Sequence, residues 1–162
     1  MKEANTKMSI EIFVLSDTTI SSIVEWQHAI GVADFPLRLT AGPLDLSGGS
    51  LTVQLHDKPA TLEYRVEDFE ALRNFYKNIS FGRDWKCVLA LPWITGFDGL
   101  TAAWMAATAY ARATNGAVFD PQEGRVFSPA EATKVVHNIE RIRPEAEAKL
   151  QTFAEKPSTK SN

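Results

Sequence analysis

The chain has 162 residues, of which 44% are hydrophobic and 23% charged, a composition typical of one soluble globular domain. Its net charge of -3 and its scattered Lys and Arg residues argue against nucleic-acid binding, which usually needs a basic face or stripe. The single cysteine, Cys87, excludes an intramolecular disulfide and fits a reducing compartment.

The ends of the chain carry no targeting signal that we can identify. Met1–Lys7 is polar and lacks the apolar core of a secretory signal. The longest apolar run, near Cys87–Leu91, is too short to span a bilayer. We therefore expect a cytoplasmic protein with no membrane partner, with residues 1–7 flexible, one α+β domain over residues 8–155, and a disordered tail over residues 156–162.

The first third of the chain predicts a strand, a helix and a second strand. Ile10–Leu15 is apolar and rich in residues that favour strands. Ser16 or Asp17 is then expected to cap a helix over Thr18–Gly31. A short strand is expected over Phe35–Thr40.

A loop and a hairpin should follow. Ala41–Ser50 is rich in Gly, Pro, Ser and Asp, which indicates a loop. Leu51–Leu55 alternates apolar and polar residues, so one face of this strand should meet water. Thr61–Val66 is its expected partner, across a turn at residues 56–59.

Glu67 and Asp68 are expected to open a second helix, because acidic side chains suit the positive end of the helix dipole. Its buried stripe should comprise Phe69, Leu72, either Phe75 or Tyr76, and Ile79. Trp85–Leu91 is apolar at nearly every position except Lys86, which predicts a central strand covered on both faces.

A third helix is expected over Gly99–Thr114, with Asp98 as its cap. It is rich in alanine and almost uncharged, so it should be largely buried. Asn115 and Gly116 should end it, because both tolerate the left-handed conformation of a helix C-terminus.

The last part of the chain predicts two short strands and a helix. The strands are Ala117–Asp120 and Arg125–Phe127. Ser128-Pro129-Ala130-Glu131 is a capping box with Pro at the first helical position. Pro144 is expected to break or kink this helix, leaving Glu145–Ala154 as a loosely attached extension.

The order of these elements is β-α-β-β-β-α-β-α-β-β-α. It mixes hairpins with crossover helices. We therefore predict a single α+β domain, in which about four helices pack on a mixed sheet.

The chain lacks the motifs of several kinds of active site. Three histidines lie on different predicted elements, with no second ligand at metal spacing, so we expect no metal and no cofactor: His28, His56 and His137. Cys87 is expected to be a small core residue. No Gly-x-Ser-x-Gly elbow or phosphate-binding glycine fingerprint is present, which favours a protein that is not an enzyme.

Three carboxylates keep an enzymatic alternative open. Asp17, Asp98 and Asp120 each fall at or just beyond the end of a predicted strand, where ligands often bind in open sheets. Helix capping and turn formation also account for them. The alternative function is a small-molecule-binding or hydrolytic domain with these carboxylates around one pocket.

A second group of candidates suits protein binding. Trp93, Phe97 and Trp104 cluster around the loop after the predicted central strand, and Trp is favoured in interface hot spots. The turn at Asp120–Gly124, Asp-Pro-Gln-Glu-Gly, has a more specific sequence than a turn alone requires. The expected binding residues are therefore Trp93, Phe97, Asp98, Trp104, Asp120, Gln122 and Glu123.

The string Ala-x-Ala-x-x-Thr-Asn-Gly-Ala-Val-Phe-Asp-Pro-Gln-Glu-Gly, which ends at Gly124, resembles a segment of small bacterial α+β proteins of unknown function. Some of those proteins resemble immunity proteins encoded beside polymorphic or type VI secreted toxins. With vaguer similarity at Val14–Asp17 and Glu25–Gln27, the resemblance covers about a fifth of the chain and includes no catalytic motif. It implies a non-enzymatic bacterial protein that binds and blocks a partner.

These observations favour a cytoplasmic bacterial protein-binding module, an immunity protein that blocks a toxin by occlusion. An acidic surface with aromatic side chains would suit a basic partner such as a nuclease. A further hypothesis is a homodimer that pairs through the edge of the hairpin or through the last helix.

Overall fold

A computed structural model describes the backbone of residues 10–40, 44–45, 48–93 and 96–159, and the side chains up to residue 149. Within these ranges the chain forms seven strands and four helices in the predicted order, which confirms the α+β class. The elements are β1 (Ile10–Ser16), α1 (Ile23–Val32), β2 (Leu37–Leu39), β3 (Gly48–Leu55), β4 (Lys58–Glu67), α2 (Phe69–Phe75), β5 (Cys87–Trp93), α3 (Phe97–Thr114), β6 (Ala117–Asp120), β7 (Arg125–Phe127) and α4 (Pro129–Thr159).

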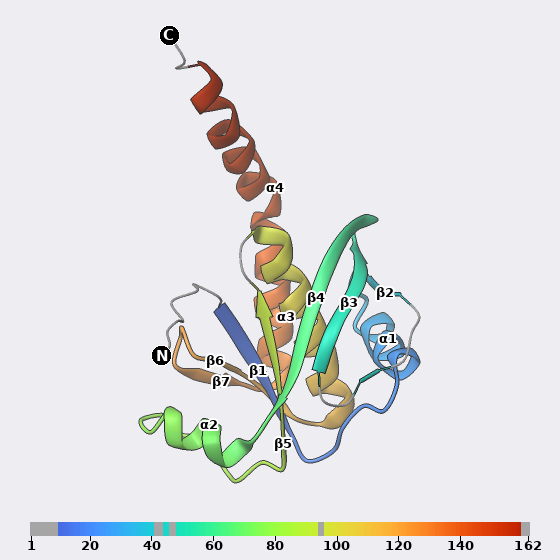
Figure 1. Cartoon of the computed structure of the whole chain (residues 1–162), viewed down its shortest axis with the longest axis vertical. Helices are drawn as coiled ribbons and strands as arrows, with labels where there is room; N and C mark the ends of the chain where they lie inside the picture. Colours follow the sequence, from blue (N-terminus) through green and yellow to red (C-terminus); the bar gives the residue numbers. More distant parts are fainter. Residues whose placement is uncertain (1–9, 41–43, 46–47, 94–95, 160–162) are drawn as a thin grey trace.

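The strands form one sheet in the order β2-β3-β4-β5-β1-β6-β7 (Figure 1). All of its described pairings are antiparallel, where a mixed sheet was predicted. The helical crossovers explain this difference. Both β5 and β6 run antiparallel to β1, so they are parallel to each other, but β1 lies between them. Similarly, α1 carries the chain from β1 to β2 at the far edge of the sheet. Neither the connection through α1 nor the connection through α3, from β5 to β6, therefore places parallel strands side by side.

The two faces of the sheet carry very different layers. On β1, Ile12 and Val14 belong to a large core to which α1, α3 and α4 contribute, while Phe13 and Leu15 face the opposite side. Among the described residues, α2, which has seven residues, and the segment after it are what covers that opposite side. The strand β5 is buried on both faces, as predicted for a central strand. The outer face of β3 and β4 is exposed and polar, which confirms the predicted alternation.

Helix α3 lies at the centre of the large core. Eleven of its 18 residues are buried, which confirms the expectation from its alanine-rich composition. It ends as predicted: Asn115 adopts the left-handed conformation, and the N–H of Gly116 donates to the carbonyl of Ala111 at 2.8 Å.

Two helices begin at other residues than the sequence suggested. Helix α1 begins at Ile23 because Ser22 caps it, and Glu25 reaches back to the N–H of Ser21. Asp17 is therefore not its cap. Helix α3 begins at Phe97 after Gly96, with no side-chain cap, so Asp98 does not cap it either.

The other two helix starts follow the predictions. The side chain of Asp68 accepts a hydrogen bond from the N–H of Ala71 at 3.0 Å and caps α2. Ser128 and Glu131 form the reciprocal capping box of α4, with distances of 2.8 and 3.1 Å.

Helix α4 passes through Pro144 and continues to Thr159, so the predicted break does not occur. Figure 1 shows its C-terminal part extending away from the sheet. Residues 156–159, expected in a disordered tail, continue the helix, whereas residues 1–7 and 160–162 lie outside the described ranges.

The β3–β4 hairpin turns at His56 and Asp57, whose φ angles of 51° and 66° are those of a two-residue hairpin turn. Strand β3 begins at Gly48, earlier than expected; of the predicted loop, residues 41–43 and 46–47 are not described. In the sheet order both hairpin strands have a neighbour on each side, although β2 pairs only with residues 53–55 of β3 within the described ranges. The homodimer through the hairpin edge therefore stays a prediction. At the true edge strand β2, the Gln27 amide donates to the carbonyl of Leu37 and accepts from the N–H of Leu39, which satisfies outward-facing backbone groups.

Candidate functional site

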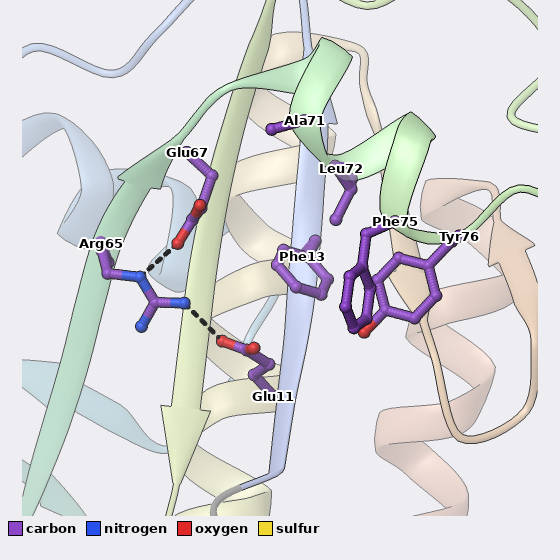
Figure 2. A pocket seen from close by; sticks show the side chains of 8 residues that line it. All are labelled: Glu11, Phe13, Arg65, Glu67, Ala71, Leu72, Phe75 and Tyr76. Atoms are coloured by element: carbon purple, nitrogen blue, oxygen red, sulfur yellow. Dashed lines mark hydrogen bonds and ion pairs between the residues drawn. The ribbon is translucent and has the colours of Figure 1, made fainter. Parts of the chain in front are cut away.

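An open groove of about 290 Å³ lies between α2 and the thinly covered face of the sheet. It is lined by side chains from β1, β4 and α2 and the residue after α2: Glu11, Phe13, Arg65, Glu67, Ala71, Leu72, Phe75 and Tyr76. Figure 2 shows the charged residues on one side, the rings of Phe75 and Tyr76 on the other, and Phe13 between them. We call this feature the α2 groove.

The shortness of α2 places two adjacent aromatic rings in different environments. Phe69 and Leu72 anchor the helix in the smaller core, and the helix ends at Phe75. Tyr76 then turns inward, with its ring centroid 6.3 Å from that of Phe13 and 5.1 Å from that of Phe119. The side chain of Phe75 remains 78% exposed. Of the two alternatives in the predicted stripe, Tyr76 is therefore the inward-facing one.

A cluster of three charges forms the opposite side of the α2 groove. Arg65 Nη2 donates to Glu11 Oε1 at 2.8 Å, and Arg65 Nε donates to Glu67. Partial burial alone would lower the pKa of Arg65, but the hydrogen bonds to Glu67 and Glu11 outweigh it and raise this pKa. Two carboxylates thus share one guanidinium, and the cluster keeps one net negative charge.

Tyr76 links the aromatic and charged sides of the α2 groove. Partial burial, followed by the negative charge of Glu11, raises the pKa of Tyr76. The phenol therefore remains protonated at neutral pH and keeps a hydrogen that it can donate to an acceptor.

The β6–β7 turn lies next to this face of the molecule. The register that pairs Phe13 with Phe119 places the turn beside the N-terminal end of β1, where Glu11 lies. A Cβ atom added at Gly124 would lie 3.6 Å from Ile79 Cδ1, so the turn also packs against the segment that follows α2. Gln122 and Glu123 are exposed there.

The three predicted aromatic binding residues belong instead to the large core on the other face of the sheet. Trp104 is 3% exposed and its ring lies 5.6 Å from that of Phe127. Trp93 is partly buried against this core and packs on Gly99. Phe97 is also partly buried. The predicted set of binding residues is therefore divided between the two faces.

Arg143 of α4 covers this aromatic group. Its guanidinium lies 5.0 Å from the ring centroid of Phe97 and pairs with Asp98 at 3.0 Å and with Glu147 at 3.0 Å. Its Nε donates to Glu140 at 3.1 Å, and the other oxygen of Glu140 lies 2.6 Å from the ring of His56. These contacts hold α4 against α3 and the hairpin turn, so Asp98 has a structural partner.

The strand-end carboxylates do not gather around one pocket. Asp17 follows β1, and Arg83 Nη1 donates to it at 2.6 Å. Because Ile10 pairs with Trp93, the chain leaves β5 at the opposite end of β1, and Asp98 follows there. Asp120 accepts a hydrogen bond from the N–H of Gln122 at 3.0 Å within its own turn. The alternative of a hydrolytic pocket has no support in this arrangement.

Asp120 and Asp17 should affect stability in opposite directions. Burial raises the pKa of Asp120 despite the backbone donors of Gln122 and Glu123, whereas the hydrogen bond from Arg83 lowers the pKa of Asp17. The folded state therefore opposes ionisation of Asp120, and its contribution to stability falls as the pH rises through its raised folded-state pKa.

We expect Asp120→Asn to increase the free energy of unfolding at pH 7 by at most about 0.5 kcal/mol, because solvent screens the half-buried carboxylate, with the gain disappearing as the pH falls below the ordinary Asp pKa. Asp17→Asn should lower stability at pH 7, and this loss should also vanish in acid. Urea unfolding of both variants between pH 3 and 7 measures the two trends. If Asp120→Asn still stabilised the protein in acid, the raised pKa of Asp120 would not be the cause of the stabilisation.

Within the described ranges, no three His, Cys, Asp or Glu side chains are gathered where they could hold a metal ion. None of the helices described is both long and apolar enough to cross a membrane. Other open hollows among the described residues include one beside β2 and one between α3 and α4, the latter lined by Arg112, Lys134 and His137. Neither of these two is lined by an exposed Phe, Tyr or Trp side chain.

Sequence reasoning missed Phe75, Glu11 and Arg65 as candidate binding residues. A signal for Phe75 was present: adjacent aromatics on a short helix cannot both face the core. No signal paired Arg65 with Glu11, because the two residues are far apart in sequence and meet only through the order of the strands.

Comparison of the chain with protein-family models, with curated proteins and with solved structures gives no match. The function proposed below therefore rests on the described residues and on the resemblance of the segment that ends at Gly124.

Proposed function

We propose that this chain is a bacterial protein-binding module that acts without catalysis, as an immunity protein that blocks a secreted toxin by covering its active site. The α2 groove and the exposed β6–β7 turn beside it form the contact surface. This proposal keeps the predicted residues Asp120, Gln122 and Glu123, and replaces the buried aromatic group with Phe75 and Tyr76.

The observation that carries the proposal is the exposure of Phe75 beside charged and aromatic neighbours. An exposed Phe is costly to leave in water, and the α2 groove places it next to Tyr76 and Arg65. Aromatic residues and Arg are the side chains enriched at protein interfaces, and truncation of Tyr or Arg there is often the most damaging. Among the described residues, the short α2 gives this face a thin cover, which suits contact with a large partner.

The rim of the surface favours a basic partner. Glu11 and Glu67 carry negative charge on this side and share Arg65, and Glu123 is exposed on the turn beside them. Such a rim would speed association with a basic protein and fix its orientation. Occlusion needs no catalytic group on the blocking protein, which agrees with the dispersal of the strand-end carboxylates.

Co-expression of the chain with the product of the adjacent gene tests the proposal. That product should be toxic alone and harmless together with the chain, and the two should co-elute in gel filtration. Phe75→Ala should weaken the complex about 30-fold, the effect of losing a hot-spot side chain worth about 2 kcal/mol.

The matched control is Val24→Ala, which removes a side chain that is 80% exposed on α1, on the other face of the sheet. This variant should bind like the original chain. A harmless adjacent product, or the absence of a complex, would contradict the proposed function. A complex that Phe75→Ala leaves unchanged would contradict the proposed surface.

A further inference from the structure

We infer that the α2 groove is a receptor for an arginine side chain of the partner protein, whose guanidinium lies between the exposed ring of Phe75 and the carboxylates of Glu11 and Glu67. The inference rests on the proposed protein-binding function and adds to it the chemistry of one central contact.

The α2 groove has more negative than positive charge, which favours binding of a cation. Arg65 occupies one oxygen of Glu11 and one of Glu67, and these are the hydrogen bonds that the described residues make to the two carboxylates. An ionised carboxylate offers about four acceptor positions, so most of this capacity is available to a ligand. One net negative charge also remains after Arg65 is counted.

The aromatic side of the α2 groove suits a planar cation. Among the described residues, four arginines lie over aromatic rings, with Arg83 over Trp85 at 3.7 Å as the shortest example. Among the described residues, the ring of Phe75 has no such cation, although it is the most exposed aromatic side chain there. A guanidinium on this ring would gain a cation–π contact while its edge donates to the carboxylates.

Arginine fits this arrangement better than lysine. Its guanidinium is planar, so it can stack on Phe75 and present several N–H donors in one plane toward Glu11 and Glu67. Arg65 shows that the spacing of these two carboxylates accommodates a guanidinium. An ammonium group would satisfy the charge but would not stack.

Titration of the isotope-labelled full chain with Nα-acetyl-arginine amide, followed by amide chemical shifts in NMR, tests the inference without any partner. Shifts should concentrate at Glu11, Phe13, Arg65, Glu67 and residues 71–76, with a Kd on the order of millimolar. The isosteric but uncharged citrulline derivative should leave these resonances in place. Glu11→Gln should weaken binding of the arginine probe about fivefold and Phe75→Ala about threefold, whereas Val24→Ala should not change it.

The possible outcomes separate this inference from the proposed function. Shifts with citrulline equal to those with arginine, shifts spread evenly over other exposed carboxylates, or no shift at the α2 groove would each overturn the arginine receptor. A stable complex with the adjacent gene's product that Glu11→Gln does not weaken would overturn it too, while leaving the protein-binding function intact. Groove-specific binding of the probe without any complex would uphold the receptor and count against the toxin-blocking function.

Discussion

Gly116→Ala is expected to destabilise the protein by at least about 3 kcal/mol, the upper part of the range for forcing an extra group into a packed interior. A Cβ atom at this position would lie 2.2 Å from the backbone oxygen of Leu15, far inside van der Waals contact. Neither the backbone of Leu15 nor that of Gly116 can move away easily. Leu15 belongs to a strand paired on both sides, and the N–H of Gly116 is held by the carbonyl of Ala111 at 2.8 Å.

Gly31→Ala is the matched control for this substitution. Gly31 lies in α1, and nothing lies within 4 Å of a Cβ atom added there. Because alanine favours a helix more than glycine does, this variant should be more stable by about 0.5–1 kcal/mol. Urea unfolding monitored by circular dichroism measures both changes. A loss below about 1 kcal/mol for Gly116→Ala would mean that β1 shifts to admit the methyl group.

Trp26→Ala should reduce the free energy of unfolding by about 4 kcal/mol, within the range for removal of a large buried aromatic side chain. The Trp26 side chain is fully buried between α1, α3 and the sheet. Its ring meets those of Tyr64 and Tyr110 edge to face, at 6.0 and 5.3 Å, and its Nε1 donates to the carbonyl of Ala106 at 3.1 Å. Truncation would leave a cavity where these three elements meet.

Trp85→Ala provides the comparison, because the same side chain is removed from a partly buried position at the edge of the smaller core. Trp85 donates to the carbonyl of Phe81 and is covered by Arg83, so a loss of about 1–2 kcal/mol is expected. Denaturant unfolding of both variants gives the two losses. Equal losses would show that the cavity at Trp26 collapses and that the packing around α3 is looser than the structure indicates.

The candidate site was less predictable than the fold. The turn that contains Asp120, Gln122 and Glu123 could be predicted because a turn sequence is local, but its role in binding stays a prediction. Trp104, a predicted binding residue, is buried, because its exposure depends on what α4 and β7 place over it. The α2 groove could not be predicted, since Glu11 and Arg65 meet across β5, which lies between β1 and β4 in the sheet.

Local patterns in the sequence were enough to predict the elements and their order. Periodicity placed β6, β7 and the central strand, and the capping residues Asp68, Ser128 and Asn115 placed ends of three helices. These features are local, because hydrogen bonds over three or four residues and alternation along one strand decide them. The start of α1 was predicted wrongly: Ser16 or Asp17 was expected to cap it, whereas Ser22 does.

By contrast, tertiary packing determines which strands are neighbours and which side chains are left exposed. The insertion of β1 between β5 and β6 makes the sheet antiparallel, and it brings Glu11 to the same face as Arg65 and the β6–β7 turn. The brevity of α2 leaves Phe75 uncovered. Strand order and layer coverage depend on packing between segments far apart in sequence, and no local pattern encodes that packing.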